Sequence, residues 1–182
     1  MNFEKKEILE LIQRANTSLD TEKLISDIQK LKEERQEFYL TFYEFERILR
    51  WKLTSQFGRQ KKIREKNTDS NVRIITKAAF AVNHTEKNFE IALKLKILTT
   101  LTGVEIPVAS AILTLCYPEL YSVIDFRNWR QIYNTDKKKT NYTVKEYIDY
   151  LHKIRDYANN YGITPQQMDI AIWQKDKEER KK

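Results

Sequence analysis

Glycine, proline, cysteine and histidine are all scarce in this chain of 182 residues. Three glycines and three prolines make 6 of 182 residues, about 3%, where an average protein has roughly 12%. β-Sandwiches, β-barrels and Rossmann domains need these residues at their tight turns, so the composition argues against all three and leaves no glycine-rich phosphate loop. One cysteine and two histidines exclude an intrachain disulfide, a Cys/His zinc site and a four-cysteine iron–sulfur cluster.

Long apolar runs are also missing. No stretch of 18 apolar residues occurs, so we expect no membrane span and no membrane partner. The first residues, MNFEKKEILELIQR, are charged and amphipathic rather than continuously apolar, so we expect no signal peptide. The expected compartment is therefore a reducing cytoplasm.

What the chain does contain predicts an all-α protein with a substantial core. Apolar residues make up 41% of it and aromatic residues 12%, which is enough for a core without a metal or disulfide staple. Apolar residues at helical spacing predict helices at 3–14, 37–57, 72–82 and 86–101, with Gly58 ending the second. The expected organisation is an N-terminal helical extension packed on the core (1–40), a main domain (41–174) and a charged tail that frays (175–182).

Basic residues outnumber acidic ones by 33 to 26, and the net charge of +7 suggests an anionic partner such as nucleic acid. Between positions 50 and 66 there are seven basic residues and a single acid. The basic residues of this segment are Arg50, Lys52, Arg59, Lys61, Lys62, Arg64 and Lys66. Either they form a strip that contacts DNA phosphates, or they are a solvated helix end and loop, and charge alone leaves both interpretations open.

The sharpest pattern lies between positions 90 and 118. A helical stretch, EIALKLKILTTL, is followed by a tight turn, TGVEI, and by a more apolar helix, PVASAILTLCYP. Gly103 suits the turn and Pro107 suits the first turn of the second helix, where its missing N–H costs nothing. Such a turn directs free backbone N–H groups toward a DNA phosphate, with Gly103, Val104 and Glu105 as the candidate contacts. An ordinary pair of antiparallel helices is the alternative interpretation.

Beyond this hairpin, YSVID leads into FRNWRQIY, so that Asp125 lies at the start of a new helix. With these residues the chain resembles the helix–hairpin–helix DNA glycosylases, whose pattern is a Leu-Pro-Gly-Val-Gly-like hairpin, an apolar helix and a Val-Asp pair with a catalytic Asp. It looks most similar to small members without an iron–sulfur cluster that are like the oxoguanine glycosylases. The resemblance spans roughly residues 45–174. The matching residues are Leu101, Gly103 and Val104, the Ile124–Asp125 pair, the upstream Arg50, Trp51 and Lys52, and a Tyr-rich helix before a C-terminal Ala-Ile-Trp.

The chain departs from that pattern at three positions of the hairpin. Thr102 stands where the family has Pro, which is a mild change. Glu105 stands where it has its second Gly, and a carboxylate there would lie near the phosphate. Pro107 stands where the bifunctional enzymes carry their Schiff-base Lys, so the familiar lyase mechanism is missing. Lys52 is the one amine that we consider as a substitute for it.

Asp125 also has a chemical rationale that is independent of the family. Breaking an N-glycosidic bond builds positive charge on the sugar, and a carboxylate beneath it can stabilise that charge and orient an attacking water. The base must first leave the DNA stack and enter a pocket, for which Trp51, Lys52, Asn128 and Trp129 are the candidates. A helix N-cap is the plain structural alternative for Asp125, and the two roles are compatible. Arg127 could contact a phosphate beside it, or pair with an acid of a neighbouring helix.

The prediction is thus an all-α helix–hairpin–helix DNA N-glycosylase, a monofunctional hydrolase that acts as a monomer on double-stranded DNA. We expect it to excise a damaged or modified base, in base-excision repair or in defence against phage DNA with hypermodified bases. No cofactor is expected, and the hairpin is the one place considered for a monovalent or divalent cation. Two alternatives stay open: a helix–hairpin–helix DNA-binding protein without catalysis, and a helical protein-interaction domain.

Overall fold

The computed structural model describes residues 4–136 and 138–180, and every regular element in those ranges is helical. This confirms the all-α prediction. The elements, in chain order, are α1 (Lys5–Leu19), α2 (Thr21–Glu34), α3 (Phe42–Leu53), the 3₁₀ segments η1 (Thr54–Gln56) and η2 (Gly58–Gln60), α4 (Lys61–Arg64), α5 (Asp69–Ala81), α6 (Lys87–Leu98), α7 (Ile106–Cys116), α8 (Phe126–Tyr133), α9 (Val144–Tyr161) and α10 (Pro165–Glu179). No helix in the described ranges has both the length and the apolar content needed to cross a membrane.

Threonine side chains decide where three of the longer helices begin. Thr41, Thr143 and Thr164 each accept a hydrogen bond from the backbone N–H three residues on, and the Glu or Gln at that position accepts one from the threonine's own N–H. The helix expected at 37–57 therefore starts later, at Phe42. It also ends earlier, at Leu53, so Gly58 does not cap it and instead begins η2.

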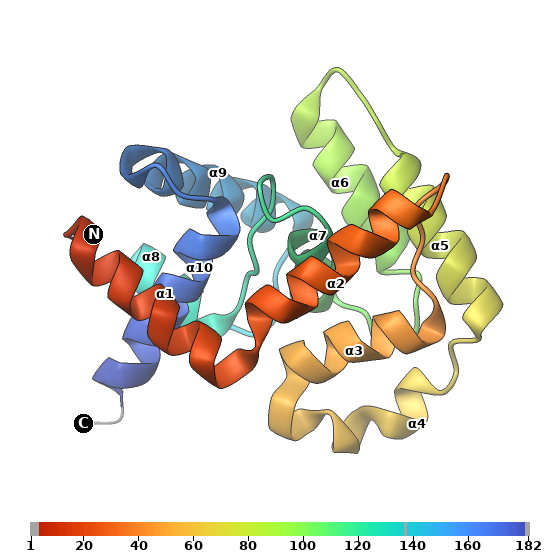
Figure 1. Ribbon diagram of the computed structural model, residues 1–182, viewed down its shortest axis with the longest axis horizontal. Helices are drawn as coiled ribbons and strands as arrows, with labels where there is room; N and C mark the ends of the chain where they lie inside the picture. The colour runs from red at the N-terminus through yellow and green to blue at the C-terminus, as the bar shows by residue number, and fades with distance from the viewer. Residues whose placement is uncertain (1–3, 137, 181–182) are drawn as a thin grey trace.

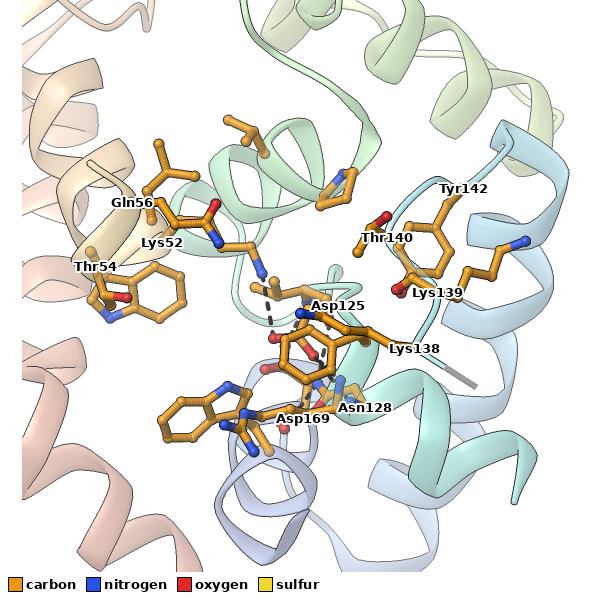
Figure 2. A pocket seen from close by; sticks show the side chains of 18 of the residues that line it. Lys52, Thr54, Gln56, Asp125, Asn128, Lys138, Lys139, Thr140, Tyr142 and Asp169 are labelled. Carbon is orange, nitrogen blue, oxygen red and sulfur yellow. Dashed lines mark hydrogen bonds and ion pairs between the residues drawn. The ribbon is translucent and has the colours of Figure 1, made fainter. Parts of the chain in front are cut away.

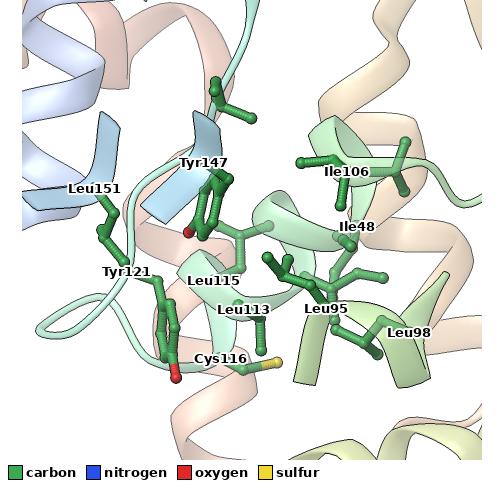
Figure 3. Packing of buried hydrophobic residues seen from close by; sticks show 14 of the residues in the cluster. Ile48, Leu95, Leu98, Ile106, Leu113, Leu115, Cys116, Tyr121, Tyr147 and Leu151 are labelled. Carbon is green, nitrogen blue, oxygen red and sulfur yellow. The ribbon is translucent and has the colours of Figure 1, made fainter. Parts of the chain in front are cut away.

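The apolar helix α7 occupies the centre of the molecule (Figure 1). All of its residues except Pro107 are buried, and it packs against α2, α3 and α6. Figure 3 shows Leu113, Leu115 and Cys116 of α7 surrounded by side chains of other elements, among them Tyr147 of α9. A helix that is apolar on every side needs such a complete shell of neighbours.

The N-terminal helices belong to the same core. Helix α1 packs along α10, and α2 crosses α7, so that both described ends of the chain lie on one side of the molecule (Figure 1). The side chains of Gln29 and Lys32 donate hydrogen bonds to the carbonyl of Cys116 at 3.3 and 3.0 Å. These bonds satisfy a carbonyl at the C-terminal end of α7, which would otherwise have no intrahelical donor.

The charged C-terminal segment, expected to fray, is helical as far as Glu179. Within this segment, Asp176 is completely buried and accepts hydrogen bonds from Arg127 at 3.0 Å and from Arg130 at 2.6 Å. A buried carboxylate with two guanidinium partners ties the last turns of α10 to α8. The charge pattern alone could not show that one of these acids faces inward.

The turn between α6 and α7 is built as the sequence predicts, with Gly103 at φ 80°. A Cβ atom at this position would lie 2.6 Å from Cγ2 of Ile63, which packs over the turn. Asn67 fastens the turn from the same side, because its Oδ1 accepts from the N–H of Thr102 at 2.8 Å and its Nδ2 donates to the carbonyl of Thr102 at 2.9 Å. The basic segment that ends at Lys66 is therefore attached to the hairpin.

We expect Gly103→Ala to lower the free energy of unfolding by about 1 to 3 kcal/mol, because alanine is strained at a positive φ and its methyl group must displace Ile63. Gly58→Ala is the matched control. It has open space around the added methyl group and should be neutral, or more stable by up to about 1 kcal/mol. Urea denaturation of both variants measures the difference, and equal stabilities would contradict this structure of the turn.

Candidate functional site

A pocket of about 440 Å³ opens between the C-terminal end of α3, the first turn of α7, the start of α8 and the middle of α10 (Figure 2). Small-molecule sites commonly have this size. A further wall comes from the segment between α8 and α9. The residues that line the pocket are Trp51, Lys52, Leu53, Thr54, Gln56, Pro107, Val108, Val123, Asp125, Phe126, Arg127, Asn128, Lys138, Lys139, Thr140, Tyr142, Asp169, Ile170 and Trp173.

Asp125 caps α8 and faces the pocket at the same time. Its Oδ1 accepts hydrogen bonds from the N–H groups of Arg127 and Asn128 at 2.9 and 3.0 Å, which confirms the expected N-cap. Its Oδ2 lies 3.5 Å from Nζ of Lys52, and 17% of its side chain remains exposed. The N-terminal end of a helix and an ammonium group both stabilise a negative charge. Asp125 is therefore a carboxylate held in one orientation with access to the pocket.

Lys52 comes from the last turn of α3 and reaches the same point of the pocket. Only 11% of its side chain is exposed, so its amine faces Asp125 rather than bulk water. The neighbouring Trp51 anchors this part of α3, because its Nε1 donates a hydrogen bond to Oγ1 of the buried Thr21 at 3.1 Å. The structure thus brings together Trp51, Lys52 and Asp125, three of the residues that the sequence singled out.

Asn128 also lines the pocket, as predicted, although only 1% of it is exposed. Its Nδ2 donates to the carbonyls of Val123 and Asp169 at 3.3 and 3.1 Å and to the hydroxyl of Tyr150 at 3.2 Å. Its Oδ1 is buried and has no hydrogen-bond partner among the described residues. Such an unsatisfied atom is uncommon in a folded protein and calls for an explanation.

Asp169 is an acid in the pocket that sequence reasoning missed. It lies on α10 and is 4% exposed, and its Oδ2 accepts a hydrogen bond from the N–H of Val123 at 2.6 Å. Burial, and to a lesser degree the charge of Asp125, raise the pKa of Asp169 well above its ordinary value, although the Val123 amide and Lys52 act in the other direction. The available signal was a single acid inside the apolar run MDIAIW.

Trp129, which the sequence analysis grouped with Trp51, Lys52 and Asn128, is not among the residues that line this pocket. Its ring packs against Tyr133 and Tyr142, with ring centroids 4.0 and 5.3 Å away. The residues of α8 that line the pocket are Phe126, Arg127 and Asn128. The aromatic faces that do line the pocket, besides Trp51, are Phe126, Tyr142 and Trp173.

Arg127 lines the pocket but is already paired. Its guanidinium donates to the buried carboxylate of Asp176 at 3.0 Å, and it lies over the rings of Phe126 and Trp173 at 5.2 and 5.7 Å from their centroids. Of the two roles considered for this residue, the structure contains the ion pair with an acid of a neighbouring helix. Contact with a phosphate stays a prediction.

The basic segment divides into exposed and buried members. Arg59, Lys61 and Lys62 are exposed, and Lys61 has 71% of its side chain in solvent. Arg64 is different, because it is 4% exposed, stacks on the ring of Phe57 at 3.6 Å from its centroid and forms a 3.1 Å ion pair with Glu46. Arg64 thus holds the segment in place, and its expected contact with DNA stays a prediction.

The hairpin presents some backbone donors and uses others internally. Val104 was expected to contact a phosphate, but its side chain is buried and its N–H donates to the carbonyl of Leu101 at 3.1 Å, so it shapes the turn instead. The N–H groups of Gly103, Glu105 and Ile106 donate to no acceptor in the described part of the chain. Glu105 is exposed, and its side chain makes no capping bond to α7.

The chain matches no protein-family model, no curated protein and no solved structure, so its function is inferred from the pocket and the hairpin. Within residues 4–136 and 138–180, no group of three or more His, Cys, Asp or Glu side chains is placed to hold a metal ion.

Proposed function

We propose that this protein is a DNA N-glycosylase of the helix–hairpin–helix type, which takes a damaged or modified base out of double-stranded DNA and hydrolyses its N-glycosidic bond. The observation that carries the proposal is the position of Asp125. It is a carboxylate fixed by two backbone amides and by Lys52, at the side of a pocket of about 440 Å³ with aromatic walls. The product would be an abasic site.

The chemistry follows from the charge that develops during this reaction. As the bond between C1′ and the base breaks, positive charge grows on the deoxyribose, and the carboxylate of Asp125 would stabilise it and take a proton from the attacking water. An extruded base can stack on aromatic side chains, and Trp51, Phe126 and Trp173 offer ring faces in the pocket.

The hairpin and the basic segment would hold the DNA. Three free N–H groups at the turn can bind a phosphate, and the exposed Arg59, Lys61 and Lys62 lie on the segment that Asn67 fastens to the turn. Glu105 opposes this binding by its charge. Pro107 and Val108, in the first turn of α7, line the pocket, so the turn that would bind DNA and the pocket are joined by one short piece of helix.

The base that is excised defines the biological role. An oxidised or alkylated base would indicate base-excision repair, and a bulky hypermodified base would indicate defence against phage DNA. Mass spectrometry of the bases released from a panel of modified DNAs, phage genomes included, distinguishes these roles.

Asp125→Asn is expected to slow base release by about 100-fold or more while DNA binding persists, because the amide cannot stabilise the positive charge on the sugar. Asparagine is a good N-cap, so the melting temperature should stay close to that of the wild type. Single-turnover base release and duplex binding are measured on the same preparations. A wild-type rate in this variant would contradict the catalytic role, and DNA binding without base release in the wild type would favour the non-catalytic DNA-binding protein.

Replacing Arg59, Lys61 and Lys62 all by Gln is expected to weaken duplex binding equally for every DNA sequence. Each phosphate contact releases counterions, so the dependence of the logarithm of affinity on the logarithm of salt concentration should become less steep by up to about 3. The matched control neutralises Lys5, Lys6 and Lys23, which lie on α1 and α2 away from the hairpin. An unchanged slope in the first variant, or the same change in both, would place the DNA surface elsewhere.

Lys52 provides the test of the reaction type. Nζ of Lys52 lies 3.5 Å from Oδ2 of Asp125 and is engaged in that ion pair, and Pro107 has no nucleophile, so we expect water to be the nucleophile and the product to be an intact abasic strand. Nicks should appear only after hot alkali, and borohydride should trap no protein–DNA adduct. A trapped adduct that disappears in Lys52→Ala would show instead that this amine replaces the lysine missing at Pro107.

A further inference from the structure

The pocket contains two carboxyl groups in opposite surroundings. Asp125 has hydrogen-bond donors or a cation at both oxygens. Asp169 has one donor, the N–H of Val123 at Oδ2, and no described residue donates to its Oδ1. Figure 2 shows Asp125, Asn128 and Asp169 close together, with the amine of Lys52 reaching toward Asp125 from α3. Pairs of acids whose surroundings favour different protonation states are a common basis for acid–base catalysis.

The groups that surround Asp169 do not offset the loss of hydration that its charged form suffers on burial. Lys52 on α3 favours its ionised form, but Lys52 is already paired with Asp125, whose negative charge favours the neutral form. On α9, the hydroxyls of Tyr147 and Tyr150 donate to the carbonyls of Ser122 and Val123, so neither of them donates to Asp169. Burial raises the pKa of Asp169 well above its ordinary value, which favours the neutral form of this group.

Asn128 supplies a second, independent observation. Its amide orientation is determined by its surroundings, because Nδ2 meets three acceptors: two carbonyls and a tyrosine hydroxyl. A flipped amide would place its oxygen against both carbonyls. Oδ1 is thus left as a buried acceptor without a partner, on a residue that lines the pocket beside Asp169. An acceptor in this state fits a donor group that a ligand brings with it.

We propose that Asp169 is a second catalytic residue, a neutral acid that donates its proton to the extruded base as the N-glycosidic bond breaks, while Oδ1 of Asn128 accepts a hydrogen bond from the same base. This proposal rests on the proposed glycosylase function. The ligand class is a base whose edge offers a hydrogen-bond acceptor close to a donor.

Every proton and every bonding electron is accounted for in the proposed step. The bonding electrons of the C1′–N bond leave with the base, and the proton of Asp169 neutralises the charge that they would create there. Water forms the new bond to C1′, and its proton passes to Asp125. Asp169 then regains a proton from solvent and Asp125 loses one, so the enzyme returns to its starting state. General acids of this kind contribute about 100-fold or more to rates.

A protonation measurement tests the proposal without any substrate. With ¹³C-labelled aspartate carboxyl groups, the wild-type spectrum should contain one carboxyl signal at the position of a protonated acid at pH 7. This signal should be absent in Asp169→Asn and present in Asp156→Asn, an exposed aspartate of α9. In Asp169→Asn, the amide oxygen can still accept from Val123, so the fold should persist. An Asp169 signal that titrates in the ordinary range of aspartate overturns the proposal, even if no DNA substrate is known.

A kinetic comparison tests the catalytic step. For a neutral base, Asp169→Asn should lower the rate of base release by about 100-fold. For a cationic base such as N7-methylguanine, which leaves without needing a proton, the two proteins should be similar. A structural role for Asp169 would affect both bases equally, and that result overturns the proposal.

The wild-type protein supplies the remaining control if Asp169→Asn is unstable. A neutral acid is lost as pH rises through its raised pKa, so release of the neutral base should fall on the alkaline side while release of the cationic base does not. Equal pH dependence for both bases contradicts the proposal and leaves the glycosylase function intact. Absence of release from any DNA would count against the glycosylase function instead, and the carboxyl spectrum would still decide the state of Asp169.

Discussion

The burial of α7 is the constraint on which the rest of the structure depends. A helix that is apolar on every side must be enclosed, and α2, α3 and α6 pack around it. Its ends are the only places where polar backbone groups need partners. At the C-terminal end, Gln29 and Lys32 donate hydrogen bonds to the carbonyl of Cys116. The N-terminal end of α7 follows directly on the Gly103 turn. Pro107 and Val108 of this end line the pocket, so the first turn of α7 joins the hairpin to the pocket.

The two carboxyl groups of that pocket, Asp125 and Asp169, have different surroundings. Helix amides contact one oxygen of Asp125 and Lys52 lies near the other, whereas Asp169, buried on α10, has a single backbone donor. The pair would suit a reaction in which one group must stabilise positive charge and the other must supply a proton. Lys52 would have a role in this arrangement, because its amine lies 3.5 Å from Asp125. It comes from α3, whereas α7 has Pro107 at the position where a lysine was sought.

Local patterns predicted much of this arrangement, and long-range contacts decided the rest. The helices, the Gly103 turn and the Asp125 cap could be predicted because each depends on residues a few positions apart. Arg64 and Trp129 could not be placed, because their partners Glu46 and Tyr142 come from other segments of the chain. Asp169 was missed for the same reason, since nothing near it in the sequence indicates that α10 turns this one acid toward Asp125.

By itself, the sequence determined that the chain is helical, where its glycine turn lies and which aspartate begins the helix after the hairpin. These properties follow from side-chain spacing and from hydrogen bonds within one or two helical turns, so they need no knowledge of the distant chain. Only the tertiary structure decided that Lys52, Asn128, Asp125 and Asp169 share one pocket, that Arg64 is buried, and that the basic segment is fastened to the hairpin through Asn67. Those outcomes depend on how helices from distant parts of the chain enclose α7, because packing, and not local propensity, selects which polar side chains are left facing the pocket.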